Sequence, residues 1–301
     1  MPSSRLSEDV DMPVSREYNV FKPRSGKKSV FRSLQSLVGR GQDDPLHKLA
    51  DMYEQLQPSQ ILTDVPYLSA VASVLFAAVF TRLDVALVIS FLSRFSMRPF
   101  AEAWEQLTLL MIYLYRTRKV GLKYKGRGVQ LPACPSAKPP LNPKVFKQLL
   151  GLIVFSDASW KNNSSYAGFF VMLSGAAVDW GAVLLKVMCS SAEAEIASGS
   201  LASKRVIYIR SFLGEIMAMP QLPVSHIIDN SALPSLTENL GSSKKTEHFR
   251  RWQLIMRYMV THGYTYVHLC KTADMLADPM AGTPKDYIQF LNFRRYVTGM
   301  S

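Results

Sequence analysis

The chain has 301 residues, of which 48% are hydrophobic and 19% are charged. This composition is typical of a globular protein of one or two domains and excludes a wholly disordered chain. The 35 Lys and Arg residues outnumber the 23 Asp and Glu residues, which gives a formal net charge of +12. Such an excess says nothing about the fold, but it favours an anionic partner, most commonly nucleic acid.

The cysteines and the apolar segments of the sequence indicate in which cellular compartment the protein is expected. The three cysteines, Cys134, Cys189 and Cys270, are widely spaced and form neither a disulfide framework nor a Cys-x-x-Cys zinc pattern. The N-terminus has no apolar segment typical of a signal peptide, so we expect an intracellular protein, cytoplasmic or nuclear. The most apolar run, residues 71–90, contains Arg82 and Asp84, which are costly in a bilayer. It therefore predicts a buried helix and no membrane contact.

Charge is spread unevenly along the chain. Residues 1–45 mix Ser, Arg, Lys, Pro and Gly without periodicity, so we expect a disordered basic and polar tail there. Residues 116–150 contain nine Lys or Arg, no Asp or Glu, and five prolines, which predicts an irregular linker over residues 121–150. The linker is either a solvated spacer or an electrostatic strap on a phosphate backbone. The strap residues that would bind nucleic acid are Lys119, Lys123, Lys125 and Arg127.

Residues 46–120 predict a small helical unit. Their periodicity indicates helices over residues 46–57, 67–95 and 100–118, the second of them long or broken. One face of the third helix is apolar, because it carries Trp104, Leu107, Leu110, Met111 and Leu114. We expect Trp104 and Tyr113 to be largely buried, with the helices packed as a bundle against the rest of the chain or apart from it.

Residues 151–301 alternate between strands and helices. The predicted strands are 152–160, 165–173, 176–187, 223–229 and 264–270, and the predicted helices are 190–217, 246–263 and about 274–296. Short turns separate the first three strands, which favours an antiparallel meander. The order βββαβαβα predicts an α/β fold with a mixed five-stranded sheet and flanking helices.

Four carboxylates occupy particular places in this order. Asp157 and Asp229 end predicted strands, Glu195 lies in the first turns of a long helix, and Asp278 begins the last helix. Strand ends and helix starts can bring such groups to one edge of a sheet. Hydrolysis of a phosphodiester by two metal ions needs several converging carboxylates, and Mg²⁺ prefers these hard oxygen ligands. Spacing alone is weak evidence, since most acidic residues cap helices or face solvent.

The strings around these acids are FSDASW, then DW at 179–180, SSAEAEI, IIDNSA and LADPM. In this order they resemble the ribonuclease H domain of copia-type retrotransposon polyproteins. Upstream, residues 66–99 and the string IYLYRTRKVGLKY resemble the segment that follows the polymerase active site in the same polyproteins. The resemblance implies a ribonuclease H-like fold for residues 151–301 and the C-terminal end of a reverse transcriptase for residues 46–120.

The same resemblance implies an activity: metal-dependent hydrolysis of the RNA strand of RNA–DNA hybrids during reverse transcription. The catalytic residues, and the ligands of two Mg²⁺ or Mn²⁺ ions, would be Asp157, Glu195, Asp229 and Asp278. Glu193 would be a helix-start residue, and Asp274 a cap or solvent residue. A second basic cluster would either grip phosphates or form a solvated helix face; its members are Lys244, Lys245, Arg250, Arg251 and Arg257.

Several positions depart from the family pattern. After the Trp of the third strand, where the family has a Lys-rich stretch, this chain has Ala182, Val183 and Leu184. After IIDN the family has a Gln, and this chain has Ser231. After LADP the family continues to Thr-Lys, whereas here Ala281 and Gly282 follow. The helix after Thr246 also lacks the family's Lys-His-Ile-Asp start and has Leu254 near its second His position. All four carboxylates remain, so the departures bear on activity more than on fold.

A polymerase active site is not evident in the sequence. The adjacent pair Asp43–Asp44 lies in a polar segment and not in a Tyr-x-Asp-Asp hairpin. A reverse transcriptase palm supplied by the same polyprotein would then be a partner, beside the hybrid. The alternative to an active nuclease is a catalytically inactive retroelement remnant that folds or binds nucleic acid without cleaving it.

Overall fold

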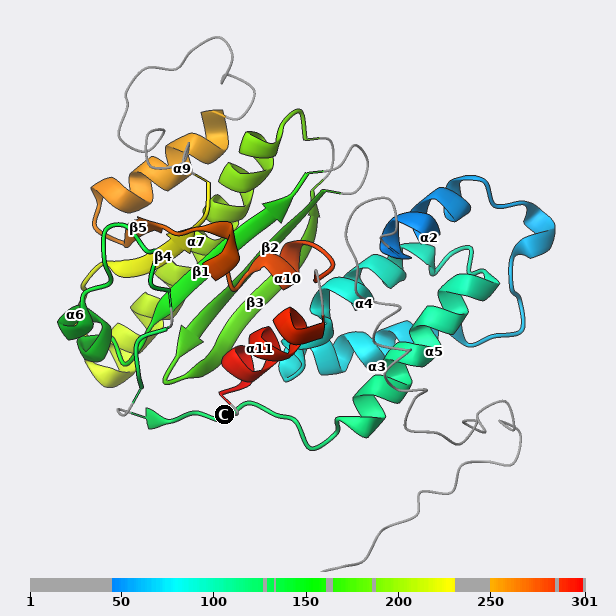
Figure 1. The fold of residues 1–301 in the computed structure, drawn as a ribbon, viewed down its shortest axis with the longest axis horizontal. Coiled ribbons are helices and arrows are strands. Elements are labelled where there is room, and N and C mark those ends of the chain that lie inside the picture. Colours follow the sequence, from blue (N-terminus) through cyan, green and yellow to red (C-terminus); the bar gives the residue numbers. More distant parts are fainter. Residues whose placement is uncertain are drawn as a thin grey trace, which may run out of the picture.

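The structure, a computed structural model, describes residues 45–126, 129–132, 134–160, 165–185, 188–230, 250–284 and 287–299. The predicted tail over residues 1–45 lies outside these ranges except for its last residue, and so do Arg127, Lys244 and Lys245. Within the ranges, a sheet with helices on both faces stands beside a separate group of helices (Figure 1).

Five strands form one mixed sheet in the order β3-β2-β1-β4-β5. Their bounds are Ile153–Ser159 for β1, Ser165–Leu173 for β2, Ala176–Leu185 for β3, Val224–Ile228 for β4 and Thr265–Leu269 for β5. β2 pairs antiparallel with β1 and β3, whereas β4 pairs parallel with β1 and β5. Ser174 and Gly175, with φ angles of 52° and 88°, form the tight β2–β3 turn. The predicted mixed five-stranded sheet, with its first three strands antiparallel, is confirmed.

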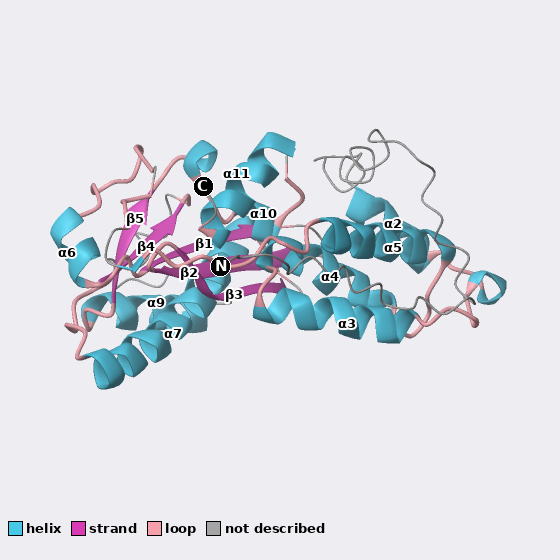
Figure 2. Ribbon diagram, turned by 90° about the horizontal axis from the view of Figure 1, so that it is seen from below, coloured by secondary structure: helices cyan, strands magenta, loops and turns pink. Residues whose placement is uncertain are grey.

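Helices cover both faces of this sheet: α7 and α9 lie on one face, and α10 and α11 on the other (Figure 2). Their bounds are Ser191–Met217 for α7, Arg250–Thr261 for α9, Asp278–Ala281 for α10 and Tyr287–Thr298 for α11. Successive residues of β1 point to opposite faces. Val154 accordingly packs in a cluster with Val206 of α7, while Phe155 packs in a cluster with Phe293 of α11. The apolar run at the start of β1 thus serves both layers.

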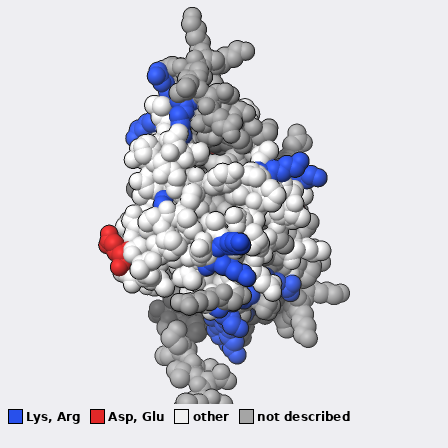
Figure 3. All heavy atoms as spheres, turned by 90° about the vertical axis from the view of Figure 1, so that its left-hand side faces the viewer, with Lys and Arg blue, Asp and Glu red and all other residues white. Residues whose placement is uncertain are grey.

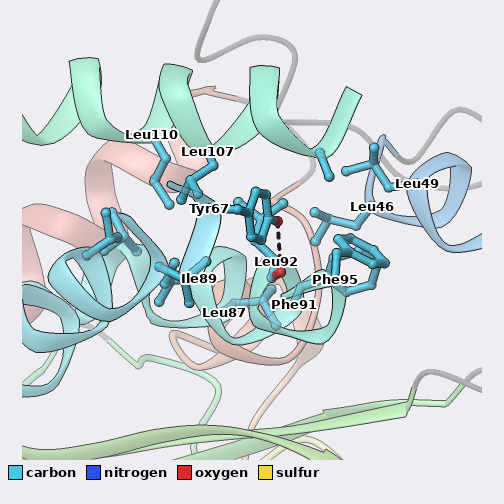
Figure 4. Close-up of a cluster of buried hydrophobic side chains, with 14 of the residues drawn as sticks. Leu46, Leu49, Tyr67, Leu87, Ile89, Phe91, Leu92, Phe95, Leu107 and Leu110 are labelled. Atoms are coloured by element: carbon cyan, nitrogen blue, oxygen red, sulfur yellow. Dashed lines mark hydrogen bonds between the residues drawn. The ribbon is translucent and has the colours of Figure 1, made fainter. Parts of the chain in front are cut away.

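The predicted helical unit forms beside the sheet. Its helices are Pro45–Glu54 for α2, Tyr67–Phe80 for α3, Ala86–Leu92 for α4 and Ala101–Arg116 for α5, with 3₁₀ turns at Leu83–Val85 and Ser93–Phe95. In its core, the hydroxyl of Tyr67 donates a hydrogen bond to the carbonyl of Leu92 at 2.9 Å (Figure 4). Tyr113 is buried as predicted. Trp104 is only partly buried, because it packs on Tyr67 at the edge of the cluster.

The apolar run of residues 71–90 is divided between α3 and α4. Arg82 and Asp84 lie in the break, and both are buried. Among the helices in the described ranges, none combines the length and apolar character needed to span a membrane.

The helical unit packs against β3, the outer strand of the sheet. The indole nitrogen of Trp180 donates to the carbonyl of Ala78 at 2.8 Å, and the hydroxyl of Ser90 donates to the carbonyl of Ala182 at 3.0 Å. Ala182 and Leu184 also pack against the core of the unit. These two apolar side chains therefore form part of the interface between the sheet and the helical unit.

A buried polar network makes a second link between the two parts. Arg82 donates two hydrogen bonds to the carboxylate of Asp84, at 2.8 and 2.9 Å. The same carboxylate accepts a hydrogen bond from the hydroxyl of Tyr113 at 2.6 Å, and Arg294 of α11 donates to that hydroxyl at 2.9 Å. The network therefore ties the helical unit to the last helix of the sheet domain.

The basic segment between the two parts is more ordered than the proline content predicts. Lys138 exchanges two backbone hydrogen bonds with Leu269 of β5, at 2.7 and 2.8 Å. A short helix, α6 (Pro143–Gln148), begins with proline and is capped by Asn142, whose side chain accepts from two backbone N–H groups. The described residues between 121 and 142 are otherwise without α-helix or strand, as the proline content predicts, but α6 and the pairing of Lys138 give the segment a fixed course along the edge of the sheet.

Candidate active site

Three of the four predicted carboxylates meet at one end of the sheet. Asp157, Glu195 and Asp229 each offer an oxygen atom, and these atoms all lie within 4.8 Å of one another. Asp157 is buried, and the other two are partly buried. Residues far apart in the sequence thus converge where the strands β1 and β4 end.

The strand register explains the first pair. β1 and β4 are parallel neighbours, and Phe155 pairs with Ile227. Two residues further along each strand, Asp157 and Asp229 are therefore brought to the same level at the carboxyl end of the sheet.

Helix α7 supplies the third carboxylate. Ser190 caps the helix, its hydroxyl accepting from the backbone N–H of Glu193 at 3.2 Å, and the Glu193 carboxylate accepts from the backbone N–H of Cys189 at 2.7 Å. Glu193 is therefore a helix-start residue, as predicted. One turn beyond Glu195, the hydroxyl of Ser198 donates to the backbone carbonyl of Asp157 at 2.7 Å, which fixes the start of α7 against β1.

The three acids are electrostatically strained. The pKa of Glu195 is raised to about 10, first by burial and then by the neighbouring charges of Asp157 and Asp229, with a smaller contribution from Asp278. A hydrogen bond to the backbone at Ala158 acts in the opposite direction. Like charges at this separation favour the binding of a proton or a cation.

Asp278 lies beside this group but outside the set of three. It is buried at the start of α10, with Pro279 in the first helical turn as predicted. Its carboxylate oxygen Oδ2 accepts a hydrogen bond from the side-chain nitrogen of Gln289 at 2.7 Å. Its charge reaches Glu195, since it contributes to the raised pKa there.

A glycine allows α10 to lie this close to the sheet. Gly168 of β2 pairs directly with Asp157 of β1. A Cβ atom at Gly168 would lie 2.4 Å from the carbonyl carbon of Met280 and 2.5 Å from the nitrogen of Ala281. The backbone of α10 therefore occupies the space that any side chain at residue 168 would need.

A buried histidine lies behind the site. His226 of β4 is fully buried between the hydroxyls of Ser156 and Ser203, at 2.8 and 3.2 Å from its two ring nitrogens. Burial lowers the pKa of His226 to about 3. The ring is therefore neutral, and it fastens β1, β4 and α7 together.

The donor set fits divalent cations. Asp157, Glu195 and Asp229 present hard carboxylate oxygens close enough to share an ion, which is the ligand type that Mg²⁺ and Mn²⁺ prefer. The raised pKa of Glu195 fits the same conclusion, because a cation would relieve the crowding of negative charge.

The predicted strap lies at the other end of the sheet. The backbone N–H of Lys125 donates to the carbonyl of Ser174 in the β2–β3 turn. Since Met172 pairs with Ile153, that turn lies beside the beginning of β1, about 13 Å along the strand from Asp157 at 3.3 Å per residue. Exposed Lys125 is thus placed away from the carboxylates, and Lys119 and Lys123, also exposed, precede it in the same segment.

The second basic cluster is partly described. Arg250 and Arg251 are exposed and Arg257 is partly buried, all on α9, which packs against the helix that carries Glu195. Arg251 and Lys204 lie over the ring of Trp252, at 5.9 and 5.6 Å from its centroid. Figure 3 shows the side of the molecule that carries α6 and α9, where Lys and Arg are scattered and acidic side chains are sparse.

Asp274 has a structural role. Its carboxylate accepts hydrogen bonds from the backbone N–H and the hydroxyl of Ser136. The hydroxyl of Ser136 in turn accepts from the backbone N–H of Lys271. Asp274 therefore holds the basic segment at the end of β5.

Three residues that shape the site are not among those predicted from the sequence. Gly168, Ser198 and Gln289 act through contacts with parts of the chain that are 11 to 112 residues away. For Ser198, the helical spacing of three from Glu195 is a signal that could have been used, since it places both on one side of α7.

Known proteins support the resemblance found in the motifs. The chain is 29% identical over 188 residues to the Pol polyprotein from transposon TNT 1-94 of Nicotiana tabacum, covering 62% of this chain and 13% of that polyprotein. It is 32% identical over 163 residues to a putative Ty5-1 transposon protein of Saccharomyces cerevisiae, covering 52% of this chain and 46% of that protein. It is 29% identical over 153 residues to secreted RxLR effector protein 161 of Plasmopara viticola, covering 49% of this chain and 94% of that protein. No family model matches the chain.

The tobacco relative is a retrotransposon Pol polyprotein and the yeast relative is a transposon protein, so the predicted resemblance to retrotransposon polyproteins is confirmed. The chain spans a small part of the length of the tobacco polyprotein. Among solved structures, ribonuclease H1 of Halobacterium salinarum matches with a TM-score of 0.35 and 11% identity, over 44% of this chain and 93% of that one.

Proposed function

We propose that the chain is a ribonuclease H-type endonuclease that hydrolyses the RNA strand of RNA–DNA hybrids in a retroelement's reverse transcription. The convergence of Asp157, Glu195 and Asp229 within 4.8 Å at the end of the sheet carries this proposal. Asp278 would be the fourth acid, as the resemblance implies; it is buried at the start of the adjoining helix α10. The similarity to Pol polyproteins supports the retroelement context.

Each residue has a defined task in this proposal. Asp157, Glu195 and Asp229 would hold divalent ions, with Asp278 binding from the side of α10. When bound, a pair of Mg²⁺ or Mn²⁺ ions supplies an activated water and stabilises the leaving 3′ oxygen. Ser198 and the buried His226 keep the strands and α7 in register, so the carboxylates stay in place between reactions.

Substrate selection would depend on shape and charge. An RNA–DNA hybrid is distinguished from DNA by its A-like geometry and its 2′-hydroxyls, and not by its base sequence. Arg250, Arg251 and Arg257 of α9, which packs against the helix that carries Glu195, would bind phosphates, and we propose the same role for Lys244 and Lys245, which lie outside the described residues. The lysines at the far end of the sheet would bind phosphates several base pairs away.

The test is hybrid cleavage by the full chain with Mg²⁺ and with Mn²⁺. Asp157→Asn should abolish cleavage and leave hybrid affinity and the unfolding temperature near their wild-type values, since the amide keeps the shape and loses the charge. Glu193→Gln is the matched control: it lies two residues from Glu195 and accepts a hydrogen bond from Cys189 that an amide oxygen also accepts. It should retain most activity.

Two outcomes would reject the proposal. Cleavage by Asp157→Asn at the wild-type rate would show that the acids are not the catalytic site. If the wild type cleaves no hybrid with either metal, the chain is the inactive remnant, and the altered positions Ala281 and Gly282 beside Asp278 become the first to be restored.

The role of the distant lysines has its own test. Neutralising Lys119, Lys123 and Lys125 together should reduce the slope of log affinity against log salt by about two to three, because each phosphate contact releases counterions. Cleavage of hybrid at saturating concentration should be unchanged. An unchanged salt slope would reject the strap.

A further inference from the structure

Asp278 differs from the other three acids in how it is held. Asp157, Asp229 and Glu195 are fixed by the strands and by the long helix α7, which has 27 residues. Asp278 belongs to a helix of four residues, and it lies outside the set of oxygens within 4.8 Å of one another. A carboxylate on so short an element needs a second anchor if it is to stay oriented.

Gln289 provides a contact of that kind. Its side-chain nitrogen donates to Oδ2 of Asp278 at 2.7 Å, and the pair is partly buried. An ionised carboxylate only accepts hydrogen bonds, so the amide must present its N–H groups to it. An amide does not titrate, so the donor persists at every pH at which the protein is folded.

The helix that carries Gln289 is itself held by the helical unit. The next residue, Phe290, packs edge-on against the ring of Tyr113 at 6.1 Å between centroids. One turn later, Arg294 donates to the hydroxyl of Tyr113 at 2.9 Å. Tyr113 in turn donates to the buried carboxylate of Asp84. Contacts from outside the sheet domain thus fix α11 at the position from which Gln289 reaches Asp278.

We propose that Gln289 is a positioning residue for the fourth carboxylate, and that through α11 the helical unit helps to order the metal site. This inference rests on the proposed function for the identity of the site. In this role Gln289 acts through Asp278, whose rotamer it sets. Groups that hydrogen-bond to a metal ligand in this way typically change metal affinity or activity by about 10–100-fold when they are removed.

The experiment measures Mn²⁺ binding to the full chain by titration calorimetry, together with hybrid cleavage as a function of Mg²⁺ concentration. Gln289→Met keeps the length of the side chain and removes the donor. Gln289→Asn keeps an amide but shortens the reach, and it serves as a second variant. Asn292→Met, at an exposed position on the same helix, is the matched control.

Both Gln289 variants should bind Mn²⁺ about 10–100-fold more weakly than the wild type and need correspondingly more Mg²⁺ for half-maximal cleavage. Their unfolding temperatures in EDTA should match that of Asn292→Met, which separates positioning from a general loss of structure. Mn²⁺ affinity equal to that of the control would overturn the inference, as would a wild type that binds no Mn²⁺. A wild type that binds Mn²⁺ without cleaving hybrid would reject the proposed function alone, and the affinity difference would still decide the role of Gln289.

Discussion

Replacing Gly168 by alanine should move α10 and, with it, Asp278. The new Cβ would lie 2.4 Å from the carbonyl carbon of Met280 and 2.7 Å from its Cβ, whereas carbon atoms normally approach to about 3.5–4.0 Å. Both neighbours belong to a helix packed on the sheet, so the helix must shift by about 1 Å. Overpacking of this kind typically costs about 1–3 kcal/mol. At about 2–4 °C per kcal/mol, the unfolding temperature should fall by several degrees.

The functional loss should be larger than the loss of stability. A displacement of about 1 Å at a catalytic group can reduce the rate by about 100-fold. Thermal unfolding and hybrid cleavage of the full chain measure the two effects. Gly121→Ala is the control, because a Cβ there would meet nothing within 4 Å. If Gly168→Ala unfolds at the same temperature as Gly121→Ala and cleaves as fast, the reasoning about α10 is wrong.

Three further predictions concern the acids and the buried network. The folded-state pKa of Glu195, about 10, lies above its ordinary value of 4.5, so the metal-free protein should lose stability as pH rises between these values, by up to about 1.4 kcal/mol per pH unit. Denaturant unfolding in EDTA measures this, and the unfolding free energy of Glu195→Gln should depend less steeply on pH. Equal pH slopes for the wild type and the variant would count against the prediction. Arg82→Met leaves Asp84 buried without its cation, so the free energy of unfolding, measured with denaturant, should fall by about 3–5 kcal/mol. A loss below about 1 kcal/mol would mean that the Arg82–Asp84 ion pair does not stabilise the fold. Ser198→Ala removes the hydroxyl that donates to the backbone carbonyl of Asp157, so the free energy of unfolding should fall by about 1–3 kcal/mol while hybrid affinity stays unchanged. Weaker hybrid binding at unchanged stability would refute the structural role of Ser198.

Much of the sheet domain could be predicted from local sequence. The alternation and short turns of the first three strands specify a meander, and parallel strands separated by helices specify the rest. Asp157 and Asp229 stand directly at strand ends, which is weak evidence by itself, and it was the resemblance of the strings around them to retrotransposon polyproteins that singled them out. Glu193 was assigned correctly because the cap at Ser190 is a local pattern of hydrogen bonds.

Features that depend on contacts between distant segments could not be predicted. The proline-rich composition indicated an irregular linker, but pairing of Lys138 with Leu269 and the cap at Asn142 give that segment a fixed course. Charge density placed the strap lysines near the substrate, and only the packing of Lys125 on the β2–β3 turn shows how far they lie from the acids. The partner of Asp278, Gln289, stands on a separate helix whose position depends on the helical unit.

The packing of the helical unit on β3 bears on where the chain can be cut. Composition suggests a cut near residue 150, but a fragment that begins there would lose the carbonyl of Ala78 that accepts from Trp180. It would also expose Ala182 and Leu184, which pack against the unit. Bare outer strands recruit other strands, and uncovered apolar surface promotes association. Such a fragment should therefore aggregate, whereas limited proteolysis of the intact chain should spare the contact between β3 and the helices and yield a core that retains both parts.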